Sequence, residues 1–266
     1  MAGEDSTRVA SLVETEVRER VGYITMNRPE RRNALSYALV SQLKQAFTGF
    51  QQEAGVRVIV LRARGPVFCS GADIEYLQKL QDYTFQENLT DSLNLMELYL
   101  LMYRYPKPII AQVEGPALAG GAGLVTVCDL VVATPNASLG YPEARIGFLP
   151  AMVSYFLLRR VGEGWARELL LTAEPMPAEK AHQIGLFNYI VAPEEIRDFV
   201  HDLAVRLAKQ NSPTSLEFIR KLIADIQDMP LQAGLEFAAK MNAHARATED
   251  FRRGIAAFLR KEKIEW

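Results

Sequence analysis

The 266-residue sequence is poor in the residues that build metal centres and disulfide frameworks. Two cysteines, Cys69 and Cys128, are too few for a disulfide scaffold, and neither has a histidine near it in sequence to activate a thiolate. The three histidines, His182, His201 and His244, are scattered over expected helices without ligand spacing. These shortages predict that no metal is bound and that both cysteines are small core residues rather than nucleophiles.

Long apolar runs and an excess of basic charge are also missing. No apolar stretch approaches the ~18 residues that span a bilayer, and the amino-terminal MAGEDST is polar and acidic, unlike a signal peptide. The formal net charge is −2 and 23% of the residues are charged, so no basic surplus indicates nucleic acid. We therefore expect a cytoplasmic protein that binds neither nucleic acid nor a membrane.

Glycine is clustered, but not in the spacing of a nucleotide-binding fingerprint. The segment 113–129 (VEGPALAGGAGLVTVCD) has no G-x-G-x-x-G and no P-loop lysine. It follows KPIIAQV at 107–113, which is typical of a buried strand, so the glycines lie where a strand leads into a helix. Such a turn exposes backbone N–H groups that can hold an anion or an oxyanion. Close helix–strand packing explains the same glycines equally well when the segment is considered alone.

The hydrophobic pattern predicts one α/β domain with a helical tail. A hairpin turns at residues 18–20, and Ser36 caps a helix whose apolar positions recur at helical spacing up to Phe50. Residues 81–91 give weak signals. The expected strands cover residues 12–17, 21–26, 58–61, 107–113, 130–133, 137–140 and 187–191. Further helices are expected at 73–80, 93–103, 152–160, 165–171, 178–184, 194–209, 214–226, 231–247 and 251–259.

Three segments contain the candidate chemistry. Residues 68–74 (FCSGADI) form a second small-residue turn from strand to helix, built like the turn at Gly120, and Glu143 lies in a loop after an expected strand. Two such turns can each aim one N–H at a common point, which is the layout of an oxyanion hole. Each donor there is worth ~2.7–4 kcal/mol of transition-state stabilisation.

Four segments in order resemble motifs of the crotonase (enoyl-CoA hydratase/isomerase) superfamily, over nearly the whole chain. Each motif alone is weak, but four in family order with family-like spacing are specific. The segments are NRPERRNAL at 27–35, FCSGADI at 68–74, PALAGGAGLVTVCD at 116–129 and GYPEARIGFLP at 140–150.

The resemblance implies an α/β fold, a crotonase-like spiral of ββα units with a helical C-terminal trimerisation region. Residues 1–195 would form the core with the active site, and residues 196–266 a helical region used in homotrimers or in hexamers built as dimers of trimers. Apolar residues of this region are expected to exceed what one domain needs: Leu203, Leu207, Phe237 and Phe258.

The resemblance also implies a lyase or isomerase of fatty acid metabolism that stabilises a thioester enolate. The N–H groups of Ala72 and Gly120 would bind the oxyanion, and Glu143 would be the acid/base. Coenzyme A arrives as part of the acyl-CoA substrate, so no separate cofactor is implied. Arg31 and Arg32 either meet CoA phosphates or are solvated surface. Asp73 is also expected to cap a helix. The CoA contacts are expected at Arg31, Arg32, Ala34, Ser70, Ala72, Asp73, Ile74 and Gly120.

One departure leaves the reaction open. Hydratases of the family carry a second glutamate at the position of Gly123. With Glu143 alone, Δ3,Δ2 double-bond isomerisation is easier to derive than hydration of a 2-enoyl-CoA, which must also orient a water. Glu75, Asp91 or Glu97 could supply the missing group, without a spacing argument for any of them. A glutamate placed at 123 is expected to add hydration where the backbone accepts a side chain.

Other reactions and a non-enzymatic role are alternatives. A decarboxylase or a thioester hydrolase can use the same oxyanion hole with different acid/base groups. A non-catalytic relative that binds RNA or acts as a scaffold would keep the fold, but the near-neutral charge and the lack of basic, aromatic-interleaved stripes disfavour it.

Overall fold

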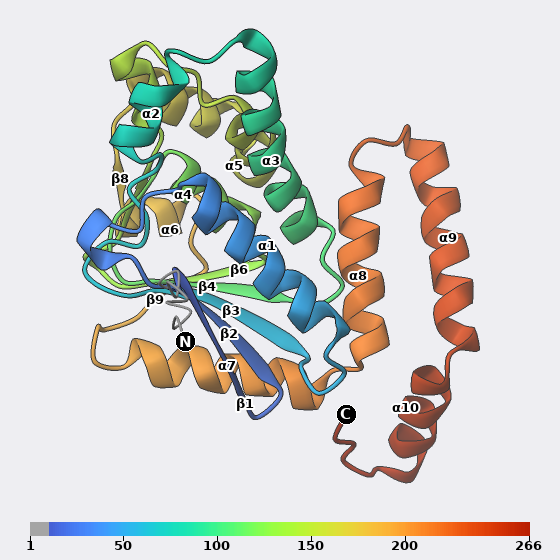
Figure 1. The fold of residues 1–266 in the computed structure, drawn as a ribbon. Coiled ribbons are helices and arrows are strands. Elements are labelled where there is room, and N and C mark those ends of the chain that lie inside the picture. Colours follow the sequence, from blue (N-terminus) through green and yellow to red (C-terminus); the bar gives the residue numbers. More distant parts are fainter. Residues whose placement is uncertain (1–10) are drawn as a thin grey trace, which may run out of the picture.

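The structure is a computed structural model, and it describes residues 11–266 (Figure 1). The amino-terminal segment, whose polarity argues against a signal peptide, lies outside these residues. The described chain begins with the expected hairpin, in which β1 (Val13–Arg18) pairs antiparallel with β2 (Val21–Met26). Glu19 and Arg20, with φ of 47° and 68°, form the two-residue turn. Positive φ at both central positions matches the twist of the strands.

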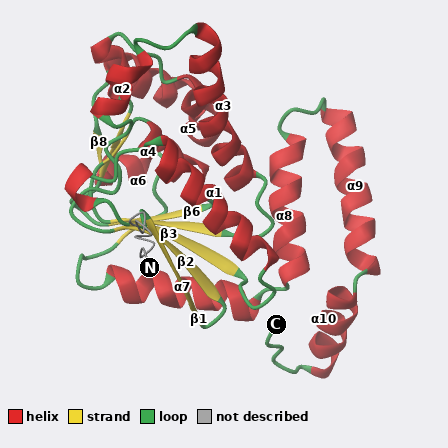
Figure 2. Cartoon of the chain, viewed as in Figure 1, coloured by secondary structure: helices red, strands yellow, loops and turns green. Residues whose placement is uncertain are grey.

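The main sheet has six strands in the order β1-β2-β3-β4-β6-β9, and every pair after the hairpin is parallel. The remaining strands are β3 (Val58–Ala63), β4 (Ile109–Val113), β6 (Leu130–Ala133) and β9 (Tyr189–Ile190). Helices cover both faces, as parallel strands require (Figure 2). Alternate residues of β3 therefore enter two different cores: Ile59 and Leu61 face one cluster, and Val58 and Val60 the other.

The larger core contains α1 (Tyr37–Gln52), α3 (Phe85–Tyr103), α4 (Gly120–Val127) and α5 (Ala151–Thr172). The smaller core contains α7 (Ile196–Gln210), which lies on the opposite face of the sheet (Figure 1). Ser36 caps α1 as predicted, because its hydroxyl accepts from the N–H of Leu39 at 3.3 Å.

A second, three-stranded sheet lies over the ends of the main strands. Its order is β5-β7-β8, with β5 (Ala117–Leu118), β7 (Ser138–Gly140) and β8 (Met176–Pro177). Of these only β7 is expected from the sequence, since two-residue strands are too short to show a pattern. Short helices complete this end of the molecule: η1 (Pro29–Arg31), α2 (Ile74–Leu80), η2 (Pro142–Ile146) and α6 (Ala178–Gln183).

Two helix boundaries differ from the prediction. The helix expected at 93–103 begins at Phe85, because Thr84 and Glu87 form a reciprocal capping box inside the stretch with weak signals. The helices expected at 152–160 and 165–171 run together as α5, interrupted where Gly162 takes φ 75° and ψ 170°.

The C-terminal helices are α8 (Pro213–Ile226), α9 (Leu231–Ala247) and α10 (Glu249–Arg260), and α9 and α10 stand apart from the sheet (Figure 1). Leu203 is buried and Leu207 partly buried against the sheet. The prediction that these two residues exceed what one domain needs is therefore wrong. Phe258 is 78% exposed. The division at 195/196 and the trimer role both stay predictions.

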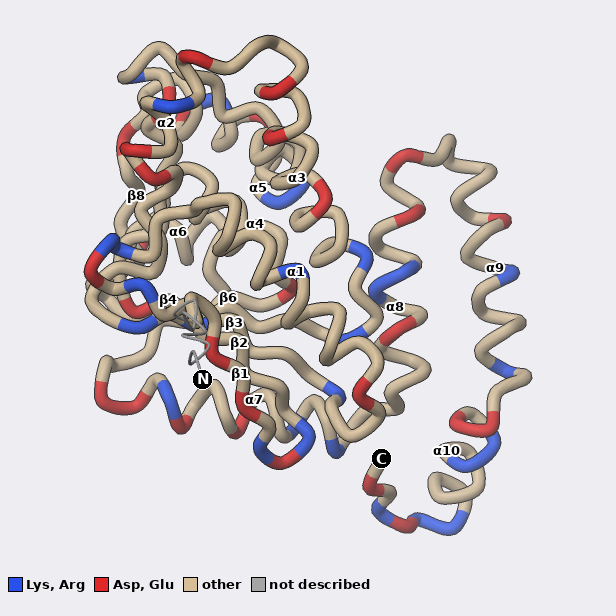
Figure 3. The backbone as a smooth tube through the Cα atoms, viewed as in Figure 1, with Lys and Arg blue, Asp and Glu red and all other residues tan. Residues whose placement is uncertain are grey.

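Basic and acidic residues are interspersed along the backbone tube (Figure 3). Within residues 11–266, no helix combines the length and the apolar character that crossing a membrane requires.

Candidate active site

The two turns expected to provide oxyanion donors lie side by side. Cys69 and Ala117 form a parallel β-bridge, in which the N–H of Leu118 donates to the carbonyl of Cys69 at 2.9 Å. Two residues further along, a Cβ added at Gly71 would lie 2.7 Å from the Cβ of Ala119, so the backbones touch there. Ala72 and Gly120 each follow this contact by one residue.

The backbone pairing of Ala72 leaves its N–H without an acceptor among residues 11–266. Leu35 forms a bridge with Ala72 by donating to the carbonyl of Gly71 at 2.7 Å and accepting from the N–H of Asp73 at 3.0 Å. In such a parallel bridge the N–H of the middle residue, Ala72, points away from its partner strand. No acceptor for it is found within residues 11–266.

Gly120 is the first residue of α4, so its N–H is one of those that the helix itself cannot pair. The N–H of Gly123 makes the first bond of the helix, to the carbonyl of Ala119 at 3.1 Å. Ala119 takes φ 51° and ψ −124°, a conformation that is strained for a residue with a side chain and is typical of functional turns. The N–H of Gly120, like that of Ala72, has no acceptor in the described part of the chain.

Glu143 lies in η2, directly after β7, and its side chain is buried: the residue is only 7% exposed. Its Oε2 atom is enclosed and has no hydrogen-bond partner within the described residues. Burial raises the pKa of this carboxyl above its usual value. A buried, unpaired carboxyl with a raised pKa is suited to accepting and returning a proton near neutral pH.

Glycine at 123 leaves no room for a second carboxylate. A Cβ added there would lie 2.5 Å from Cγ1 of Val153 and 2.7 Å from the hydroxyl of Tyr99. The condition on which a glutamate at 123 is expected to add hydration is therefore not met as the chain is packed, because both neighbours must move before any side chain fits.

Tyr99 is a residue of the site that sequence reasoning missed. It is fully buried on α3, and its hydroxyl donates to the carbonyl of Gly120 at 2.8 Å. Burial raises its pKa well above the usual value, with smaller contributions from Cys69, Tyr141 and Glu143, so it stays a neutral donor beside the acid. On an apolar helical stripe it looks like an ordinary core residue. The one indication in the sequence is that a tyrosine stands on a buried helical stripe, where its hydroxyl needs a hydrogen-bond partner.

The other carboxylates considered for catalysis have partners of their own. Glu75 forms an ion pair with Arg31 at 2.8 Å, and Glu97 with Lys44 at 2.9 Å, both with exposed carboxylate side chains. Asp91 accepts a hydrogen bond from the hydroxyl of Tyr76. None of the three is buried and unpaired as Glu143 is.

Asp73 caps α2, as predicted. It accepts from the N–H groups of Glu75 at 3.0 Å and Tyr76 at 3.4 Å, and Arg28 lies 2.7 Å away. Burial alone would raise the pKa of Asp73, but Arg28 and the two N–H groups hold it below its usual value.

The remaining expected CoA contacts gather around the start of α2. The N–H of Ser70 donates to the carbonyl of Arg32 at 3.0 Å, and Arg28 donates to the carbonyl of Ala34 at 3.2 Å. Ile74 is 75% exposed. Arg31 is already paired with Glu75, so a phosphate there must compete with that carboxylate.

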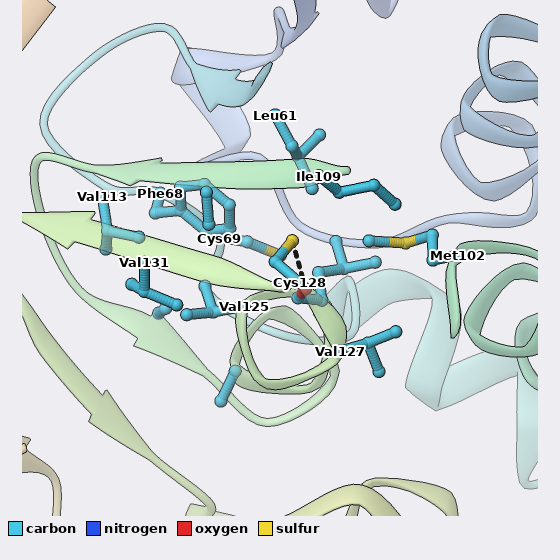
Figure 4. Close-up of a cluster of buried hydrophobic side chains, with 14 of the residues drawn as sticks. Leu61, Phe68, Cys69, Met102, Ile109, Val113, Val125, Val127, Cys128 and Val131 are labelled. Atoms are coloured by element: carbon cyan, nitrogen blue, oxygen red, sulfur yellow. Dashed lines mark hydrogen bonds between the residues drawn. The ribbon is translucent and has the colours of Figure 1, made fainter. Parts of the chain in front are cut away.

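Both cysteines are core residues, as predicted, among the apolar side chains of the larger core (Figure 4). Burial raises the pKa of Cys69 to about 12, and it raises that of Cys128 as well. Neither thiol ionises near neutral pH. In the described part of the chain, no three His, Cys, Asp or Glu side chains are grouped as metal ligands would be.

The chain is similar to known proteins over nearly its whole length. The profile of the family described as "Enoyl-CoA hydratase/isomerase" matches residues 16–266. A Thermus thermophilus protein with the name "Putative enoyl-CoA hydratase" is 44% identical over 91% of this chain and 95% of its own. The 2,3-dehydroadipyl-CoA hydratase of Escherichia coli is 33% identical over 91% and 93%.

Solved structures also match this chain over nearly its whole length. The structure of a Legionella pneumophila protein described as "putative enoyl CoA hydratase/isomerase (crotonase)" has a TM-score of 0.87 and 32% identity, covering 96% of this chain and 98% of that one. An enoyl-CoA hydratase structure from Mycobacterium smegmatis has a TM-score of 0.89 and 29% identity, with coverage of 96% and 98%.

Proposed function

The chain belongs to the enoyl-CoA hydratase/isomerase family, and we propose that it moves a proton on an acyl-CoA thioester with Glu143 as the acid/base. Family and crotonase-like fold are as the sequence motifs predicted. The observation that carries the specific proposal is the buried carboxyl of Glu143, whose Oε2 has no hydrogen-bond partner within residues 11–266. Tyr99 supports the donor turn, since its buried hydroxyl bonds the carbonyl of Gly120.

In the proposed reaction the thioester oxygen accepts from the N–H groups of Ala72 and Gly120. Removal of a proton beside the carbonyl places negative charge on that oxygen, and two fixed donors stabilise the charge where it develops. Glu143 takes the proton and returns it to a different carbon of the same chain. A carboxyl with a raised pKa serves both steps, because acceptance and return are then closely balanced.

Double-bond isomerisation is the reaction that this site supports best. It needs one proton shuttle, and the space beside Gly123 is filled by Tyr99 and Val153 rather than by a second acid. Hydration of a 2-enoyl-CoA is the second candidate, because several relatives are named enoyl-CoA hydratases. Hydration would require the phenol of Tyr99 to help hold the water.

Assays of 2-enoyl-CoA and 3-enoyl-CoA thioesters side by side test the proposal. We expect conversion of the 3-enoyl to the 2-enoyl thioester, followed by absorbance of the conjugated enoyl group, to exceed hydration of the 2-enoyl thioester by at least about tenfold in kcat/KM. Efficient hydration with slow isomerisation would reverse the order of the two candidates. Turnover of neither thioester would contradict the acid/base role of Glu143.

We also propose that the CoA contacts and the oligomeric assembly are those that the sequence motifs predict. Arg31 or Arg32 contacts a CoA phosphate, so charge reversal there should weaken acyl-CoA binding more at low salt than at high salt. The exposed Leu231, Leu235 and Phe258 suit a homotrimer or a hexamer, which analytical ultracentrifugation of the full chain would detect. A monomer at micromolar concentration would contradict this assembly. A cytoplasmic location stays a prediction.

A further inference from the structure

A second cavity lies between α5 and α8, apart from the residues of the proposed reaction. Its volume is about 400 Å³, and none of Ala72, Gly120 and Glu143 lines it. Its walls are largely apolar, with Phe156 of α5 on one side and Leu216 and Ile223 of α8 on the other. The size is in the range that small organic ligands occupy.

Three buried polar atoms on the wall of this cavity have no hydrogen-bond partner among residues 11–266. They are the hydroxyl of Tyr103, Nε of Arg159 and Nη1 of Arg220, and the Arg220 side chain is only 7% exposed. The single other enclosed side-chain atom without a partner within residues 11–266 is Oε2 of Glu143. Unpaired polar atoms in a protein interior cost free energy, and they gather where a ligand or water completes them.

The charge on the cavity wall is positive. Arg159, Arg160 and Arg220 line the cavity, and the only carboxylate on its wall is Asp129, which accepts from Nε of Arg220 at 2.8 Å. Arg160 donates to the carbonyls of Cys128 at 2.6 Å and Leu186 at 3.3 Å, so neutral oxygens rather than a carboxylate hold it.

Asp228 pairs with Arg159 and leaves one positive charge in excess. Tyr103, Arg159 and Arg220 all line this one cavity, and the Arg159 charge opposes the rise that burial produces in the pKa of the Tyr103 hydroxyl.

We propose that this cavity binds a free carboxylate carried on a short hydrocarbon chain. The carboxylate would accept from Tyr103, Arg159 and Arg220, and its chain would lie against Phe156 and the apolar face of α8. A free acid fits better than the far end of a thioester held at Glu143. Tyr99 packs edge-on against Phe156 with centroids 6.0 Å apart, and together with Val153 it fills the space beside Gly123.

Isothermal titration calorimetry of the full chain with octanoate tests this site. We expect saturable binding of one octanoate per chain with a Kd of about 1 mM or below. The alcohol of the same chain length, 1-octanol, should bind at least about tenfold more weakly, because it lacks the charge that the arginines complement. Saturating butyryl-CoA should leave the octanoate isotherm unchanged, whereas full competition would place octanoate in the Glu143 site and overturn the proposal.

Two variants localise the binding. Tyr103→Phe removes a hydroxyl that has no protein partner, so it should keep the Tm of the wild type yet weaken octanoate about tenfold. Ala224→Trp, which fills the space between α8 and the core, should abolish binding. As a control, Tyr189→Phe, on β9 and outside the cavity, should leave the affinity unchanged. Equal affinity for octanoate and 1-octanol, or no saturable binding, overturns the proposal.

Discussion

The surroundings of Glu143 and of Gly123 differ in kind. Glu143 is an enclosed acid whose Oε2 has no hydrogen-bond partner within residues 11–266. Beside Gly123, Tyr99 and Val153 fill the space that a side chain would need, and the Tyr99 hydroxyl is already bonded to the carbonyl of Gly120. One position thus has an unsatisfied polar atom, while the other is closely packed.

The close packing around Gly123 comes from two helices, α3 with Tyr99 and α5 with Val153. Gly123, Tyr99 and Val153 therefore form one packing unit, and changes at these positions should be coupled.

The largest effect is expected when the acidic group of Glu143 is removed. Glu143→Gln keeps the shape of the side chain but cannot move a proton, so turnover should fall by ~10²-fold or more while acyl-CoA binding persists. Steady-state kinetics with calorimetric ligand binding measures both. Glu163→Gln, at an exposed ion pair with Arg167 on α5, is the matched control and should change kcat by less than about twofold. Retained turnover in Glu143→Gln would remove the acid/base proposal.

Placing a carboxylate at position 123 tests whether Tyr99 and Val153 leave room for a side chain there. Gly123→Glu should lower the free energy of unfolding by about 1–3 kcal/mol or more through overpacking, without creating efficient hydration. Gly164→Glu, at a site on α5 with open space around it, should be neutral or slightly stabilising. Denaturant unfolding compares the two. Adding Val153→Ala to Gly123→Glu should recover part of the loss, and a fully stable single variant would refute the packing argument.

A smaller effect is expected when only the hydroxyl of Tyr99 is lost. Tyr99→Phe should cost about 0.5–1.5 kcal/mol of stability and reduce kcat by about tenfold or less, because the Gly120 peptide loses its anchor. Tyr105→Phe is the matched control, since its buried hydroxyl donates to the carbonyl of Phe47 at 2.7 Å. It should show a similar stability loss with unchanged kcat. Equal kcat losses in both variants would indicate general loosening rather than positioning by Tyr99.

The smallest expected effect is a change in how stability depends on pH when Glu143 is replaced. The folded chain holds the Glu143 proton to a higher pH than the unfolded chain does, so stability falls as pH rises from the unfolded pKa through the raised folded pKa. Glu143→Gln has no such ionisation. Its Tm should equal that of the wild type at low pH and exceed it at neutral pH, as measured by calorimetry across pH. A Tm difference that does not vary with pH would show that the Glu143 pKa is not raised.

Sequence reasoning predicted what depends on local pattern. The turns at Ala72 and Gly120 and the loop of Glu143 were found because small residues and Pro-Glu stand at strand ends. Tyr99 and Val153 were missed because their role depends on contact between α3, α4 and α5, and on an apolar helical stripe both look like ordinary core. The capping box at Thr84 was missed because residues 81–91 are polar and carry no apolar period.

The C-terminal residue is tethered to the end of α7. The N–H of Trp266 donates to the carbonyl of Lys209, and the ring of Trp266 lies under the guanidinium of Arg253 at 5.1 Å. The three helices between Lys209 and Trp266 therefore form a closed loop rather than a free arm. In polymer terms, fixing both ends of this loop lowers the entropy that it loses when a neighbouring surface immobilises it.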